Sequence, residues 1–128
     1  AGMATLLDDL KSYLVEEGVV PPELCTLDSM PDKPDYVVTL YEYQGATPSP
    51  QIASVHYSVQ IVVRATKSTE AKEKAWDIYK ALETEDGYLD ITPTRWSLIY
   101  LREPPFRMKV DKSGRLHYGF NLGITSHT

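Results

Sequence analysis

The sequence predicts an α+β fold, a largely antiparallel or mixed β-sheet with two α-helices packed on one face. Apolar residues recur at helical spacing in residues 4–17 and 68–83. In several other segments they alternate with polar residues or cluster with β-branched and aromatic residues, as strands do. The helical segments stand before and between the strand segments, an order typical of a sheet covered by helices on one side.

The length of 128 residues corresponds to one domain, and we expect residues 3–128 to form it. Ala1 and Gly2 precede Met3, so we interpret residues 1–2 as a tag remnant. No apolar stretch approaches the roughly 18 residues that span a bilayer. The single cysteine, Cys25, excludes an internal disulfide framework. This favours a protein made in a reducing cytoplasm, with Cys25 as a small buried residue.

The first predicted helix covers residues 4–17, and Thr5 is its candidate N-cap. Gly18 is placed to end the helix in a left-handed conformation, and the Pro21-Pro22 pair then favours an extended chain. The residues expected to face the core are Leu6, Leu7, Leu10 and Leu14.

A polar connector rich in Pro and Asp, residues 28–35, leads into a strand predicted at residues 36–43. Residues 44–51 fit no regular element, so we expect a loop long enough to act as an arm or a binding loop. Residues 54–65 are the clearest strand, with one apolar and one mixed face. The apolar face is formed by Val55, Tyr57, Val59, Ile61 and Val63.

The second predicted helix, residues 68–83, carries a buried stripe made of Ala71, Ala75, Ile78 and Leu82. Residues 88–91 are short and extended. The strand predicted at residues 95–102 has Trp96, Leu98 and Tyr100 on one face and Ser97, Ile99 and Leu101 on the other.

Residues 106–110 and 116–124 are predicted to form a hairpin, with Gly114 in its turn free to adopt a positive φ. The glycines at 119 and 123 lie inside the second strand, where we interpret them as relieving packing on one face of the sheet.

No catalytic or metal-binding constellation is found in the sequence. His56 and His117 lie on the non-core faces of predicted strands and would meet only if those strands were neighbours. Two histidines without a third ligand make a poor metal site, so we interpret both as surface or interface residues. The carboxylate pairs of the first helix are adjacent in sequence and do not face each other. We therefore expect no enzyme activity, no cofactor and no metal.

Charge is unevenly distributed in this chain of net charge −5. Residues 1–50 hold nine acids and two bases, whereas residues 51–128 hold nine acids and eleven bases. The acidic balance disfavours nucleic-acid binding. The later bases are interleaved with aromatic residues, which keeps open a stacking platform for nucleic acid. Most of those aromatics, namely Trp96, Tyr100, Tyr118 and Phe120, fall on predicted apolar faces that serve the core, and an assembly interface between unlike faces explains the asymmetry at least as well.

Four stretches together resemble the minor capsid, or tail terminator, proteins of tailed bacteriophages and prophages. The first is the helix opening Leu6-Leu7-Asp8-Asp9-Leu10, and the second runs from Met30-Pro31-Asp32-Lys33-Pro34-Asp35 to Gly45. The third is the strand Val59-Gln60-Ile61-Val62-Val63-Arg64-Ala65 with the helix that follows it. The fourth combines Glu103-Pro104-Pro105-Phe106, Asp111-Lys112-Ser113-Gly114-Arg115 and the last strand. No single motif is specific, but their order and spacing cover most of residues 6–124.

The resemblance implies a virion structural protein that assembles as a homo-oligomeric ring, commonly a hexamer, at the head-proximal end of the tail. Such a ring stops tail-tube growth, contacts the tube protein and the head connector, and lets DNA pass through its lumen without specific binding. It would assemble in the cytoplasm of the host bacterium, away from membranes. We expect the loop at 44–51 and the exposed face of the long strand to make the contacts, through Gln44, Gly45, Pro48, Pro50, His56, Gln60 and Arg64.

A small α+β ligand-binding or regulatory domain is the alternative interpretation. It requires an apolar pocket between the helix at 68–83 and the sheet, with a few convergent polar groups.

Overall fold

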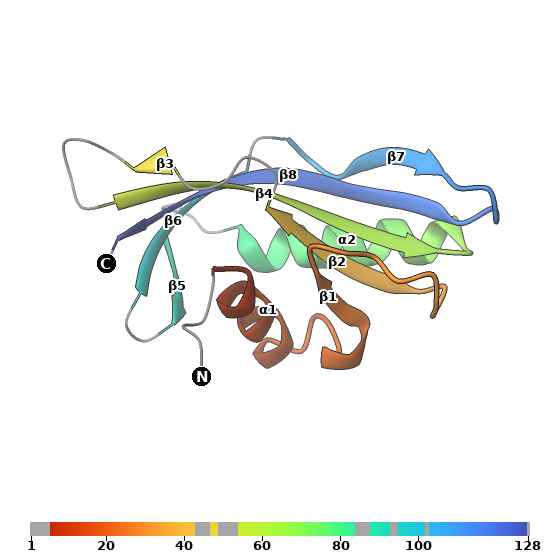
Figure 1. Ribbon diagram of the computed structural model, residues 1–128, viewed down its shortest axis with the longest axis horizontal. Helices are drawn as coiled ribbons and strands as arrows, with labels where there is room; N and C mark the ends of the chain where they lie inside the picture. The colour runs from red at the N-terminus through yellow and green to blue at the C-terminus, as the bar shows by residue number, and fades with distance from the viewer. Residues whose placement is uncertain are drawn as a thin grey trace.

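The computed structural model describes residues 6–42, 47–48, 54–83, 88–92, 95–101 and 103–127. Within these residues one mixed sheet carries two α-helices, α1 (Leu6–Glu16) and α2 (Ser68–Leu82), which confirms the α+β fold class (Figure 1). A 3₁₀ turn, η1, covers Pro22–Leu24. The strands are β1 (Cys25–Leu27), β2 (Val37–Glu42), β3 (Thr47–Pro48), β4 (Ser54–Ala65), β5 (Tyr88–Thr92), β6 (Arg95–Leu101), β7 (Phe106–Val110) and β8 (Leu116–His127).

The two longest strands, β4 and β8, form the centre of the sheet. They pair antiparallel over twelve residues, from Ser54 opposite His127 to Ala65 opposite Leu116. The other edge of β4 is shared by β2 and β3, and the other edge of β8 by β6 and β7. Beyond them, β1 pairs parallel with β2 and β5 pairs antiparallel with β6. Figure 1 shows this β4–β8 ladder running along the length of the molecule.

Helix α1 forms where the leucine spacing predicts it, and its four leucines are buried. Gly18 follows with a φ of 73°, as expected for a glycine that ends a helix. The Tyr13 hydroxyl donates a 3.0 Å hydrogen bond to the Ala81 carbonyl of α2, which ties the two helices together. The described helices are too short and too polar to cross a membrane.

Helix α2 lies against β4 and β8, and its predicted stripe, Ala71, Ala75, Ile78 and Leu82, is buried. Tyr79 packs edge-on against Phe120 of β8 at a ring-centroid distance of 5.3 Å. The small side chains of Ala71 and Ala75 allow the helix to approach the sheet closely. The space between α2 and the sheet is therefore filled core, which disfavours the ligand-binding alternative.

The alternation in β4 and β8 divides the sheet into two faces. Ile61 and Val63 of β4 and Phe120 and Leu122 of β8 belong to the core under the helices. Gly119 lies on the opposite face, where a Cβ atom would stand 1.9 Å from the Ile61 carbonyl oxygen. The expectation that Gly119 relieves packing on one face is thus confirmed.

Three expectations were wrong or incomplete. Residues 25–27 form strand β1, although no strand was predicted there. Thr47 and Pro48, expected to lie in a loop without regular structure, pair with His56 and Val55 of β4; the rest of residues 44–51 lies outside the described part. Ile99 of β6 is buried opposite Ile124 and belongs to the core; the expected burial of Trp96 and Tyr100 lies outside the described side chains.

Substitutions at two glycines distinguish the two reasons for which a glycine is required, namely close packing at Gly119 and a positive φ at Gly18. Gly119→Ala should lower the free energy of unfolding by about 2 kcal/mol or more, because the added methyl meets backbone that cannot move aside. Gly18→Ala, which has open space but a positive φ, should cost about 1–2 kcal/mol.

Asn tolerates the left-handed conformation, so Gly18→Asn should recover part of that loss, whereas Gly119→Asn should be worse than Gly119→Ala. Urea unfolding of the four variants measures these differences. A Gly119→Ala protein as stable as wild type would contradict the close approach of β4 and β8.

Candidate functional site

The polar connector between β1 and β2 is fastened to the sheet by a buried arginine. Arg64, near the end of β4, is only 3% exposed. Its guanidinium donates hydrogen bonds to three backbone carbonyl oxygens, those of Asp35 (3.0 Å), Pro34 (2.6 Å) and Asp32 (3.2 Å). Only arginine presents enough donors in a fixed fork to bind such a set. Arg64 therefore fixes the course of residues 32–35 across the sheet.

A second arginine, Arg115, binds the same connector from the start of β8. Its guanidinium donates to the Asp32 carbonyl at 2.6 Å and pairs with the carboxylates of Asp32 (3.1 Å) and Asp35 (3.2 Å). Its Nε lies 2.9 Å from Asp111 Oδ2. Arg64 and Arg115 share the Asp32 carbonyl as an acceptor, so the two side chains form one arginine clamp on the connector.

Asp111 connects the arginine clamp to His117 and to the β7–β8 turn. Its Oδ1 accepts hydrogen bonds from the backbone N–H groups of Ser113 and Arg115, both at 3.0 Å. Its Oδ2 accepts from the Arg115 side chain and lies 3.1 Å from His117 Nε2. Gly114 completes this turn with a φ of 80°, as its position predicted.

The carboxylate of Asp111 is strongly stabilised in its charged form. Burial alone would raise its pKa, but the hydrogen bonds from the Arg115 backbone, His117 and the Arg115 side chain outweigh this and hold the pKa well below its usual range. Burial lowers the pKa of the Arg64 guanidinium, and the neighbouring Arg115 charge adds to the effect. Arginine nevertheless remains protonated in proteins, so a positive charge persists here.

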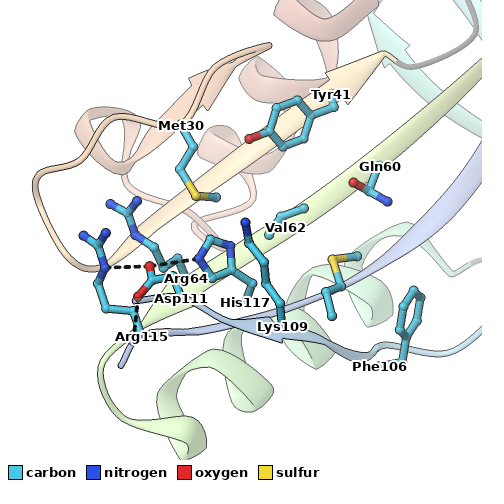
Figure 2. Close-up of a pocket in the computed structure, with 11 residues that line it drawn as sticks. Met30, Tyr41, Gln60, Val62, Arg64, Phe106, Lys109, Asp111, Arg115 and His117 are labelled. Atoms are coloured by element: carbon cyan, nitrogen blue, oxygen red, sulfur yellow. Dashed lines mark hydrogen bonds and ion pairs between the residues drawn. The ribbon is translucent and has the colours of Figure 1, made fainter. Parts of the chain in front are cut away.

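A groove of about 550 Å³ opens beside the arginine clamp, on the face of the sheet opposite the helices (Figure 2). Its apolar wall and floor come from the connector, β2, β4 and β7, with Phe106 at the end farther from the clamp. Lys109 of β7 is exposed at its edge. The lining residues are Met30, Tyr41, Gln60, Val62, Arg64, Phe106, Met108, Lys109, Asp111, Arg115 and His117.

A chain of amides runs from the groove to the loop before β7. Gln60 Nε2 donates to Asn121 Oδ1 at 3.0 Å, and Asn121 Nδ2 donates to Glu103 Oε1 at 2.9 Å. The groove therefore has the paired arginine clamp at one end, Lys109 as an exposed cation in its lining and, through this chain, an exposed carboxylate beyond the other end. This polarity would orient any charged segment that binds there.

The predicted contact residues are distributed unevenly with respect to this groove. Gln60 and Arg64 line it, although Arg64 is buried beneath the connector rather than exposed on the strand. Pro48 and His56 belong to β3 and β4, which pair with each other. Gln44, Gly45 and Pro50 lie outside the described residues.

The two histidines do not come together, although their strands are neighbours. His56 is opposite Thr125 and His117 is opposite Arg64, which separates them by eight positions, or roughly 26 Å along the strand. His117 is 8% exposed and contacts Asp111, so it is not a surface residue of the subunit, and the interface half of that interpretation stays a prediction. Over the described residues, no group of three or more His, Cys, Asp or Glu side chains is arranged to hold a metal ion.

Sequence reasoning missed the arginine clamp because it assigned faces to strands without showing what covers them. The signal was present in the acids and prolines of residues 31–35 and in the arginines at 64 and 115. The stacking platform for nucleic acid receives little support, since Phe120 is fully buried and Arg115 belongs to the clamp. The predicted burial of Cys25 is confirmed.

Removing the arginine clamp should destabilise the fold. Arg64→Met leaves the Pro34 and Asp35 carbonyl oxygens without their donor, whereas the Asp32 carbonyl keeps its bond from Arg115. We expect a loss of about 2–4 kcal/mol in unfolding free energy. Arg64→Lys keeps the charge but not the fork, so its loss should be intermediate. The control is Lys33→Ala, which removes a surface ion pair with Asp35 and should change little. Equal stability of Arg64→Met and wild type, in urea or thermal unfolding, would show that the clamp does not stabilise the fold.

Stability should fall with acid in a way that depends on Asp111. Its folded-state pKa lies below that of an aspartate in an unfolded chain, so its contribution to stability is complete above about pH 5 and is lost as the pH falls towards the folded-state pKa. We expect the gap in unfolding free energy between wild type and Asp111→Asn to shrink from pH 5 to pH 2.5. A gap that stays constant over this range would contradict the assigned hydrogen bonds.

Comparison with known proteins identifies the family of this chain. A comparison with curated proteins finds no match for the chain. A family model described as bacteriophage tail terminator protein matches residues 10–127, which include α1 from Leu10 onward, all of α2, the connector, the arginine clamp and the β4–β8 ladder. The match covers nearly the whole chain, and it agrees with the order of motifs in the sequence. The chain belongs to the bacteriophage tail terminator protein family.

Proposed function

We propose that the protein forms a ring at the head-proximal end of the phage tail, where it stops growth of the tail tube and joins the tail to the head. The observation that carries the proposal is the family match over residues 10–127. Membership of this family makes the protein a structural component of the bacteriophage tail, and hence of the virion. The ring, its position and its partners are the proposed part.

Ring closure requires head-to-tail contacts, in which each subunit presents two different and complementary surfaces. We propose that the uneven charge of the chain helps to supply them, since the first 50 residues carry the acid excess and the later residues an excess of bases. We propose a homo-oligomer, with six subunits as the expected number, built from single domains spanning residues 3–128. It assembles in the host cytoplasm as a minor capsid component.

The ring would contact the tail tube protein on one side and the head connector on the other. We propose that DNA passes through the lumen without being held, since exposed carboxylates repel its phosphates. The segment at 44–51, which contains Pro48, and the residues His56 and Gln60 remain the proposed contact region, whereas Arg64 is buried beneath the connector and would act by holding it in place. In this role the protein acts by binding alone, without catalysis or a cofactor.

The test is a tube-growth assay with the tail tube protein of the same phage. Adding the protein during polymerisation should shorten the tubes and leave rings at their ends, visible by electron microscopy. Bovine serum albumin at the same concentration is the control for unspecific crowding. Unchanged tube lengths and bare tube ends, at a molar excess of the protein, would overturn the proposal. A monomer in solution would not, because ring closure can depend on the tube.

A further inference from the structure

We propose that the groove beside the arginine clamp binds residues 16–24 of a neighbouring copy of this chain. This inference rests on the proposed ring and names the contact that closes it. The occupant is chosen by charge complementarity and by the shapes that the groove and the segment present.

One lining residue, Lys109 of β7, gives the groove an exposed positive charge. Arg64 and Arg115 offer no free charge, because their donors are bound within the clamp and three carboxylates lie close to them. An acidic side chain that enters the groove would therefore pair with Lys109 and would be directed away from Glu103 beyond the other end.

Apolar surface fills the rest of the groove. Two aromatic and two methionine side chains line it, those of Tyr41, Phe106, Met30 and Met108. Aromatic walls of this kind accept proline-rich segments in the extended polyproline conformation, and the thioethers of methionine adapt to irregular surfaces. The groove therefore suits a segment that combines prolines with acids.

Residues 16–24 are such a segment. Glu16, Glu17 and Glu23 are exposed, and the segment contains no base. Pro21 and Pro22 are exposed as well, and Pro21 has φ −64° and ψ 141°, the polyproline conformation. The last turn of α1 has no basic residue to offset its negative end.

The segment is held in place before any partner arrives. Gly18 N–H bonds to the Val15 carbonyl, and Lys74 of α2 donates a 2.7 Å hydrogen bond to the Val19 carbonyl. A preformed segment loses little conformational entropy on binding. Lys74 itself lies beside the segment, so the segment's own neighbours reduce but do not cancel its charge.

The two surfaces lie on different sides of the subunit. Residues 16–24 follow α1 on the helix side, whereas the groove lies on the opposite face of the sheet, beside β7 (Figures 1 and 2). A chain cannot place its own segment in its own groove. The contact must therefore run from one copy to the next, which generates a ring when the rotation closes.

Charge reversal and its rescue test this contact. Lys109→Glu and Glu17→Lys change exposed side chains, so each variant should fold with the thermal stability of wild type. Each should weaken subunit association about tenfold, because like charges are then opposed. The double variant should regain most of the wild-type association, since it restores opposite charges. The matched control is Lys72→Glu, which makes the same charge change on the exposed face of α2 and should leave association unchanged.

Association is measured by sedimentation over a range of concentrations, and by ring occupancy on the tube ends. Tubes capped equally by wild type and both single variants, with equal association, would overturn this contact while the tail-terminator role stands. If the single variants lose capping and the double variant does not restore it, the contact between subunits would also be overturned. The groove would then be assigned to binding of the tube protein. If the wild-type protein caps no tubes, the proposed function is contradicted instead. The sedimentation series then tests the contact alone, and a wild-type protein that never associates would count against the contact.

Discussion

The structure depends on the antiparallel pairing of β4 with β8 over twelve residues. Every other strand of the described sheet pairs with one of these two or with a strand that does. The pairing also brings the backbones so close at Gly119 that no side chain fits there. Because residues alternate along both strands, the same ladder supplies apolar side chains to the helices and polar side chains to the opposite face.

The polar face is organised by charge rather than by apolar packing. Burying arginines and a carboxylate is costly unless each is paired and hydrogen-bonded, and here Arg64, Arg115 and Asp111 find partners in the connector and the β7–β8 turn. The result is a fixed connector and, beside it, a groove whose lining includes the exposed cation Lys109. Helices on this second face would fill the space of the groove, so the groove depends on the one-sided cover of the sheet.

The sequence predicted the long elements well, because α1, α2, β4 and β8 contain enough residues for their periodicity to be read. Strands β1 and β3 have three and two residues, too few to show alternation, and they form only because β2 and β4 offer a free edge. The clamp was missed for another reason. Alternation placed Arg64 and His117 on the non-core face but could not show that residues 32–35 and Asp111 contact them there. A local sequence pattern indicates on which face of the sheet a side chain lies, whereas the segments that pack over that side chain can be far away in sequence.

The central claim is that this one-sided sheet closes a ring by presenting its groove to the next subunit. Cryo-electron microscopy of tube ends capped with the wild-type protein tests it most directly. The account predicts density for Pro21 and Pro22 of one subunit against Tyr41 and Phe106 of its neighbour, with Glu17 near Lys109. A ring in which the groove faces open solvent, the lumen or the tube protein would contradict it.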